Sequence, residues 1–118
     1  MARRRERLRA PDSEYADGEG GVLMLRGALT AATRAAYARI GSGDDMRAAA
    51  SLEDAWHRRL EFLFERLAVS WTIAGTSPIT RQRELLARFR VASPAERDWL
   101  RERVREHCAE HFPDLQPP

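Results

Sequence analysis

Apolar side chains recur at steps of three and four residues over most of the chain, which is the spacing of one face of an α-helix. The first run covers 22–40 and is rich in alanine, so a neighbouring helix can approach it closely. Gly41 follows the run and is typical of a helix C-terminus. We therefore predict a first helix over 22–40, with a short continuation through Ala50 that Asp44 or Asp45 caps.

The longest run extends over 52–74, after a serine at position 51 that is typical of a helix N-cap. Wound as a helix, it has apolar side chains on two sides, so it needs neighbours on both. We expect it to be the central helix of the fold, ending at Gly75. One stripe holds Leu52, Trp56, Leu60, Leu63, Leu67 and Trp71, and the other holds Ala55, Phe62, Val69 and Ile73.

Two Ser-Pro pairs mark the starts of two further helices, over 79–90 and 94–111. The second pair is the stronger signal, because Glu96 can complete a capping box with Ser93. This reading of the pattern finds no strand-like alternation, repeat or hairpin dipeptide. We therefore predict an all-α fold, a small bundle of about four helices with short connections.

The two ends of the chain hold few apolar side chains. Residues 1–20 contain a basic block, then an acidic block, then glycines. We predict a disordered charged tail over 1–20, a single helical domain over 21–113 and a loose C-terminal tail over 114–118. The charged tail is interpreted either as a solvated arm or as an arm that contacts nucleic acid or an acidic partner.

Composition narrows the class of protein. Of 118 residues, 43% are hydrophobic and 32% are charged, which is typical of a globular protein. All 20 basic residues are arginine, a bias that high-GC bacterial codon usage produces, and the formal net charge is only +2. That charge does not favour an obligate nucleic-acid binder. The chain has a single cysteine, Cys108, which is typical of a reducing compartment. Its longest apolar region, 60–75, contains charged residues and cannot span a membrane. We therefore expect a cytoplasmic protein with no membrane partner.

Four arginines of the 81–90 segment are candidates for contact with nucleic acid. A basic helix after a tight turn suits binding to a phosphate backbone. These arginines flank both sides of the apolar face, however, so a surface of internal salt bridges is the other interpretation. The four are Arg81, Arg83, Arg88 and Arg90.

Trp99 is the candidate for contact with a partner. It lies about 100° around its helix from Leu100, so it points away from the row that should face the core. Either a neighbour within the chain covers it, or it is exposed as the anchor of an interface. Apolar surface left over on so small a domain favours a two-fold homodimer.

His107 and His111 lie four residues apart, a spacing that lets two imidazoles reach one metal ion. The sequence identifies no further ligands, and histidines are also favourable near a helix C-terminus. We predict no metal and no cofactor.

The stretch from Arg101 to His107 resembles the Arg-x(4–6)-His motif of the HEPN ribonucleases, although the residue after the arginine is here Glu102. The resemblance implies a dimeric helical ribonuclease. In it His107 would transfer protons and Arg101 would stabilise charge.

No catalytic residues are otherwise recognisable. The leading hypothesis is a small non-enzymatic module for protein-protein interaction, or an accessory module, whose partner is another protein or a second copy. The alternative is a nucleic-acid-binding accessory or regulatory protein that uses the 81–90 helix. A HEPN-like ribonuclease comes third.

Overall fold

The computed structural model describes residues 11–40, 52–115 and 117–118. It shows four helices and a three-stranded antiparallel sheet in the described residues, so the all-α helical bundle was wrong. The strands lie in the order β1-β2-β3. Along the chain the elements are β1 (Ser13–Ala16), β2 (Val22–Leu25), α2 (Ala31–Ile40), α4 (Leu52–Leu67), β3 (Ala68–Thr72), α5 (Gln82–Arg90) and α6 (Pro94–His111).

A hairpin of β1 and β2 replaces the second half of the predicted tail and the start of the predicted first helix, while the first half of that tail, 1–10, lies outside the described residues. In the loop of the hairpin, the Asp17 carboxylate accepts hydrogen bonds from the amides of Glu19 (2.7 Å) and Gly21 (2.9 Å). Gly18 and Gly20 adopt positive φ angles of 81° and 93°, which favour glycine. Residues 17–21 are thus a five-residue, glycine-containing hairpin loop, a signal that the helical reading missed. Only 31–40 of the predicted helix is helical, and its continuation through Ala50 lies outside the described residues.

The end of the predicted central helix is a strand. The chain passes from α4 at Leu67 directly into β3, where Trp71 pairs with Leu23 of β2. A step of four residues, as from Leu67 to Trp71, returns to one face in a helix and in a strand alike. The apolar spacing therefore could not separate the two. The β-branched Val69 and Thr72 favour the strand, and pairing with β2 decides it.

The next helix begins later than predicted, because the chain first returns to the sheet. Trp71 and Ile79 exchange two backbone hydrogen bonds of 3.0 and 2.9 Å, so residues 73–78 form a loop. Gly75 has a positive φ of 80° in this loop. The predicted Ser77-Pro78 cap therefore lies in the loop, and α5 begins at Gln82.

The predicted helix over 94–111 is confirmed as α6. The Ser93 hydroxyl accepts a hydrogen bond from the Glu96 amide (3.1 Å), and the Glu96 carboxylate accepts one from the Ser93 amide (2.8 Å). Arg88 also donates to that carboxylate, at 2.6 Å. The hydrogen bond from the Ser93 amide is the main cause that lowers the pKa of Glu96.

We expect Ser93→Ala to lower the free energy of unfolding by about 1 kcal/mol. The substitution leaves the Glu96 amide without its acceptor at the first turn of α6. Urea denaturation followed by circular dichroism measures the change. Ser77→Ala is the matched control, because Ser77 caps no helix here and should change stability by only a few tenths of a kcal/mol. Equal losses in the two variants would contradict the capping role.

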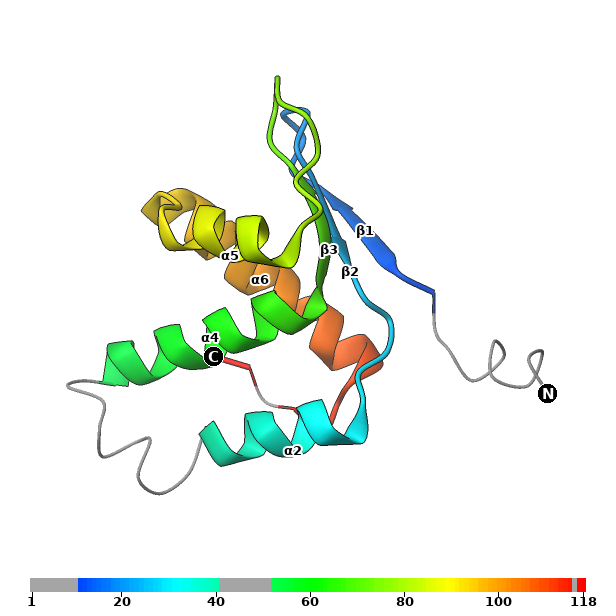
Figure 1. The fold of residues 1–118 in the computed structure, drawn as a ribbon, viewed down its shortest axis with the longest axis vertical. Helices are drawn as coiled ribbons and strands as arrows, with labels where there is room; N and C mark the ends of the chain where they lie inside the picture. The colour runs from blue at the N-terminus through cyan, green and yellow to red at the C-terminus, as the bar shows by residue number, and fades with distance from the viewer. Residues whose placement is uncertain (1–10, 41–51, 116) are drawn as a thin grey trace.

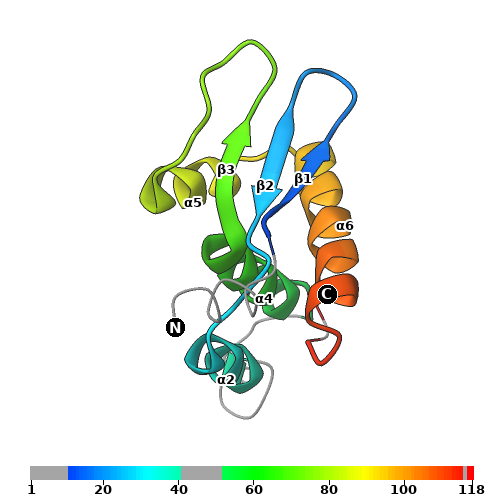
Figure 2. The same ribbon diagram turned by 90° about the vertical axis from the view of Figure 1, so that its right-hand side faces the viewer.

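The helices build the core on one face of the sheet. Figures 1 and 2 show α5 beside β3, α6 beside β1, and α2 at the end of the molecule opposite the two hairpin loops. Phe64 of α4 is completely buried, with its ring stacked on Phe89 at 4.8 Å and edge-on to Trp71 at 5.9 Å. None of the described helices has the length and apolar character needed to cross a membrane.

Candidate functional site

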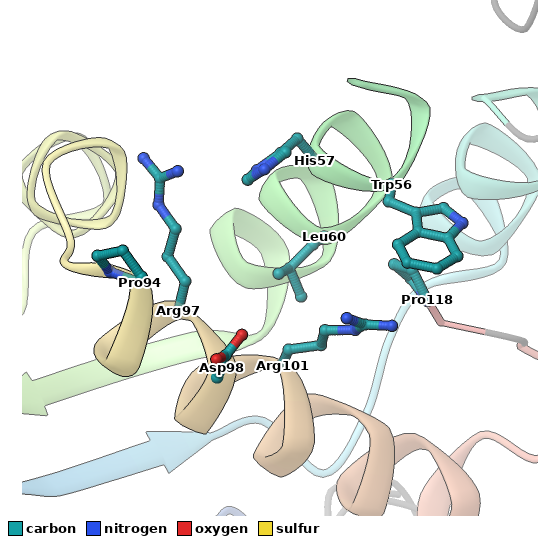
Figure 3. Close-up of a pocket in the computed structure, with 8 residues that line it drawn as sticks. All are labelled: Trp56, His57, Leu60, Pro94, Arg97, Asp98, Arg101 and Pro118. Carbon is teal, nitrogen blue, oxygen red and sulfur yellow. The ribbon is translucent and has the colours of Figure 1, made fainter. Parts of the chain in front are cut away.

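A groove of about 520 Å³ lies between α4 and α6. Figure 3 shows the side chains that converge on it from the two helices and from the last residue of the chain. Its apolar lining is Trp56, Leu60, Pro94 and Pro118, and its polar lining is His57, Arg97, Asp98 and Arg101. A groove of this size accepts a few side chains of a partner.

Trp56 is the unusual residue of the groove. The residue is 39% exposed. In the described part of the chain, the exposed large hydrophobic residues are Trp56 and Val91. The sequence placed Trp56 in a buried stripe with Leu60 and Trp71, and both of these are buried. Trp56 lies instead at the groove beside α6, where the Arg101 guanidinium covers one face of its ring, while the preceding residue Ala55 is buried. The part of the stripe around Trp56 is helical as predicted, but Trp71 lies in β3, and Trp56 is not buried with the others.

Arginines give the groove its charge. The Arg101 guanidinium lies over the Trp56 ring, 4.6 Å from its centroid. Arg97 donates from Nη2 to the Arg90 carbonyl at 2.9 Å. The Nε atoms of Arg97 and Arg101 are buried and have no hydrogen-bond partner among the described residues. The lining of the groove thus includes two guanidinium groups and one carboxylate, that of Asp98.

The predicted partner residue, Trp99, does not line this groove. Its side chain is half-buried and packs against the hydrophobic core, and the Arg103 guanidinium lies 5.7 Å from its ring centroid. The chain thus covers part of the Trp99 side chain and leaves part of it open. Its role as an anchor stays a prediction.

The four arginines of the 81–90 segment have different surroundings. Arg88 pairs with Glu96 at 2.6 Å and lies over the Trp71 ring. Arg90 donates from Nη2 and Nε to Glu61 of α4, at 2.7 and 3.2 Å. Two of the four therefore hold α5 to its neighbours. The other two, Arg81 and Arg83, are exposed and form no ion pair with a described residue.

His107 connects α6 to the sheet. It is completely buried, and its Nε2 lies 2.6 Å from the Arg26 carbonyl. A carbonyl only accepts, so Nε2–H is the donor and Nδ1 accepts from the Tyr15 hydroxyl at 2.9 Å. His111, one turn later, shares a hydrogen bond of 3.2 Å with the Ser13 hydroxyl. The two histidines thus attach the edge strand β1 to α6.

This arrangement brings neither the predicted ribonuclease pair nor a metal site together. Arg101 lies against Trp56 in the groove, whereas both ring nitrogens of His107 are engaged inside the fold. Within the described ranges, no three His, Cys, Asp or Glu side chains converge to hold a metal ion. Burial raises the pKa of the Cys108 thiol to about 12, so it is not a nucleophile at neutral pH.

We expect the free energy of unfolding to fall as the pH is lowered from about 7.5 to about 5.5. Burial is the main cause that lowers the pKa of His107 in the folded protein, against the raising effect of the Arg26 carbonyl. The unfolded chain, in which the histidine has its ordinary pKa of about 6.5, then binds a proton that the folded chain does not. Acidification below that value therefore favours unfolding.

Urea titrations of His107→Gln at the two pH values test this prediction. The free energy of unfolding of His107→Gln should depend little on pH. The control is His57→Gln, which changes a half-buried histidine of the groove and should keep the pH dependence of the wild type. The same pH dependence in wild type and His107→Gln would contradict the assignment.

Comparisons of the chain with models of protein families, with curated proteins and with solved structures gave no match. The groove between α4 and α6 is therefore the feature that supports a function.

Proposed function

We propose that this chain is a non-enzymatic interaction module that docks on another protein through the groove between α4 and α6. The observation that carries the proposal is Trp56, a large aromatic side chain left 39% exposed at a groove with an apolar lining. Tryptophan contributes more than most residues to the binding energy of interfaces, because it buries a large area when a partner covers it. The guanidinium of Arg101 lies over that ring. Arginine is also enriched at such anchor sites.

The surroundings of Trp56 support docking rather than catalysis. The lining of the groove is largely apolar, and the Arg101 guanidinium lies over the Trp56 ring and forms no ion pair with an acidic side chain among the described residues. The groove thus presents an apolar surface with charge at its sides, which is the composition of a protein interface.

Two other occupants follow from the sequence hypotheses. A second copy of the chain is one, since a small domain with an exposed apolar side chain can bury it in a two-fold dimer. Nucleic acid on α5 is the other, and it has less support, because Arg88 and Arg90 are engaged with Glu96 and Glu61. We also propose a cytoplasmic location, which the single buried thiol supports.

Site-specific photo-cross-linking in the cell of origin tests the docking proposal. A benzophenone amino acid at position 98, on the groove, should cross-link to a distinct polypeptide. The same group at position 84, exposed on α5, should not. The additional substitution Trp56→Ala should abolish the product.

Three outcomes would contradict the proposal. They are a product that survives Trp56→Ala, a product formed only from position 84, and no protein product from position 98. A cross-link between two copies of the chain would make the occupant a second copy.

A further inference from the structure

The two arginines of the groove have hydrogen-bonding capacity that the described part of the chain does not use. Arg101 donates to no described residue, and its known contact is with the face of the Trp56 ring. A guanidinium carries its N–H donors in its own plane. Stacking on an aromatic ring therefore fixes the group. The Nε–H of Arg101 is itself buried, so the in-plane donors that a ligand can reach are those of the two Nη atoms.

The acidic residue of the groove does not satisfy Arg101. Figure 3 shows Arg101 extending along the groove toward Trp56 and Pro118, whereas Asp98 lies on the side of Arg97. Among the described residues Asp98 forms no ion pair within 4.0 Å. Within the described part of the chain, the positive charge at the Trp56 end of the groove thus has no counter-charge, and it lies next to an apolar surface.

We infer that the occupant of the groove is an acidic peptide segment of a partner protein. One of its carboxylates binds the in-plane donors of Arg101 and an adjacent apolar side chain packs on Trp56 and Leu60. The inference rests on the proposed function and adds the chemistry of the partner. Carboxylate is the group that matches the guanidinium fork, since two parallel N–H···O bonds form at once.

A peptide fits this site better than nucleic acid does. Base stacking needs an accessible aromatic face, and one face of Trp56 already carries Arg101. A phosphate backbone needs a row of cations, whereas Asp98 stands among the cations of this groove. The apolar lining by Leu60 and Pro94 suits an aliphatic or aromatic side chain.

Selection from a phage-displayed library of random dodecapeptides tests the inference on the full chain. Peptides are selected on the wild-type protein, counter-selected on Trp56→Ala, and then synthesised with a fluorescein label. We expect the selected peptides to be rich in Asp and Glu beside an apolar residue. Their dissociation constants are then measured with Arg101→Gln and with Arg105→Gln, a matched control that is exposed on α6, outside the groove and 3.7 Å from Glu102.

Arg101→Gln should weaken peptide binding about tenfold or more, because it removes a charge-assisted pair, and Arg105→Gln should change it less than about twofold. Circular dichroism and melting temperature verify that both variants are folded. Trp56-dependent peptides without an acidic excess, or peptides insensitive to Arg101→Gln, would overturn the inference and leave the docking proposal standing. A library that yields no Trp56-dependent peptide would overturn both. Trp56-dependent binding of a single-stranded oligothymidine would assign the groove to nucleic acid instead.

Discussion

Phe64→Ala should lower the free energy of unfolding by about 3–5 kcal/mol, the largest effect on stability that we expect from one substitution. The Phe64 ring is completely buried where α4, α5 and β3 meet, stacked on Phe89 and edge-on to Trp71. Removing it loses the transfer free energy of the ring and both aromatic contacts, and leaves a cavity among side chains from three elements. For a domain stabilised by about 5–15 kcal/mol in total, this loss moves the unfolding transition far toward low urea.

Phe62→Ala is the matched control on the same helix. Phe62 is only half-buried, with its ring 6.3 Å from Tyr37 and the Arg66 guanidinium 5.3 Å above it. The same atoms are removed, but surrounding water and the exposed Arg66 side chain can fill the space, so the loss should be less than half as large. Urea denaturation followed by circular dichroism gives both values. A Phe62→Ala loss equal to or above that of Phe64→Ala would contradict the position of the core.

The sequence predicts best the parts of the fold that local contacts determine. The start of α6 depends on Ser93, Pro94 and Glu96, which lie within four positions, and the structure has the helix bounds that this signal predicts. By contrast, β3 depends on pairing with β2, about 45 residues earlier in the chain. No local pattern contains that pairing, and the apolar spacing of Leu67 and Trp71 fits both a helix and a strand.

The hairpin was missed for a different reason, because its signal is present in the sequence. The glycine-containing loop 17–21 lies between two short segments, and the first of these, Ser13–Ala16, holds one large apolar side chain, that of Tyr15. A strand of four residues with so little apolar surface reads as a tail. In the structure it is held by pairing with β2, by the hydrogen bond between Ser13 and His111, and by that from Tyr15 to the buried His107, 92 positions away.

The candidate site could be predicted only in part. The residues of the groove were recognised as belonging to two amphipathic helices, but their meeting depends on how α4 and α6 cross. The choice of Trp99 over Trp56 followed from the helical wheel, which gives the direction of a side chain and not what covers it. Trp56 is exposed because it lies at the groove between α4 and α6, whereas the adjacent Ala55 is buried, and no periodicity reports that difference.

Trp56→Ala should weaken binding of the cross-linked partner by about 2 kcal/mol or more, a loss of about 30-fold or more in affinity. The indole is a large apolar group that is exposed at the groove, and the Arg101 guanidinium lies over its ring. Its removal therefore takes away an apolar contact and the fixed position of a charge. Stability should change little, since much of the ring already faces water.

Val91→Ala is the control for this measurement. Val91 is 74% exposed and lies in the turn between α5 and α6, outside the lining of the groove. The decisive measurement is the pair of dissociation constants, by calorimetry, for the two variants with the partner that cross-links from position 98. Docking through the groove predicts a loss of about 30-fold or more for Trp56→Ala and less than about twofold for Val91→Ala. Unchanged affinity in Trp56→Ala, or a greater loss in Val91→Ala, would contradict it.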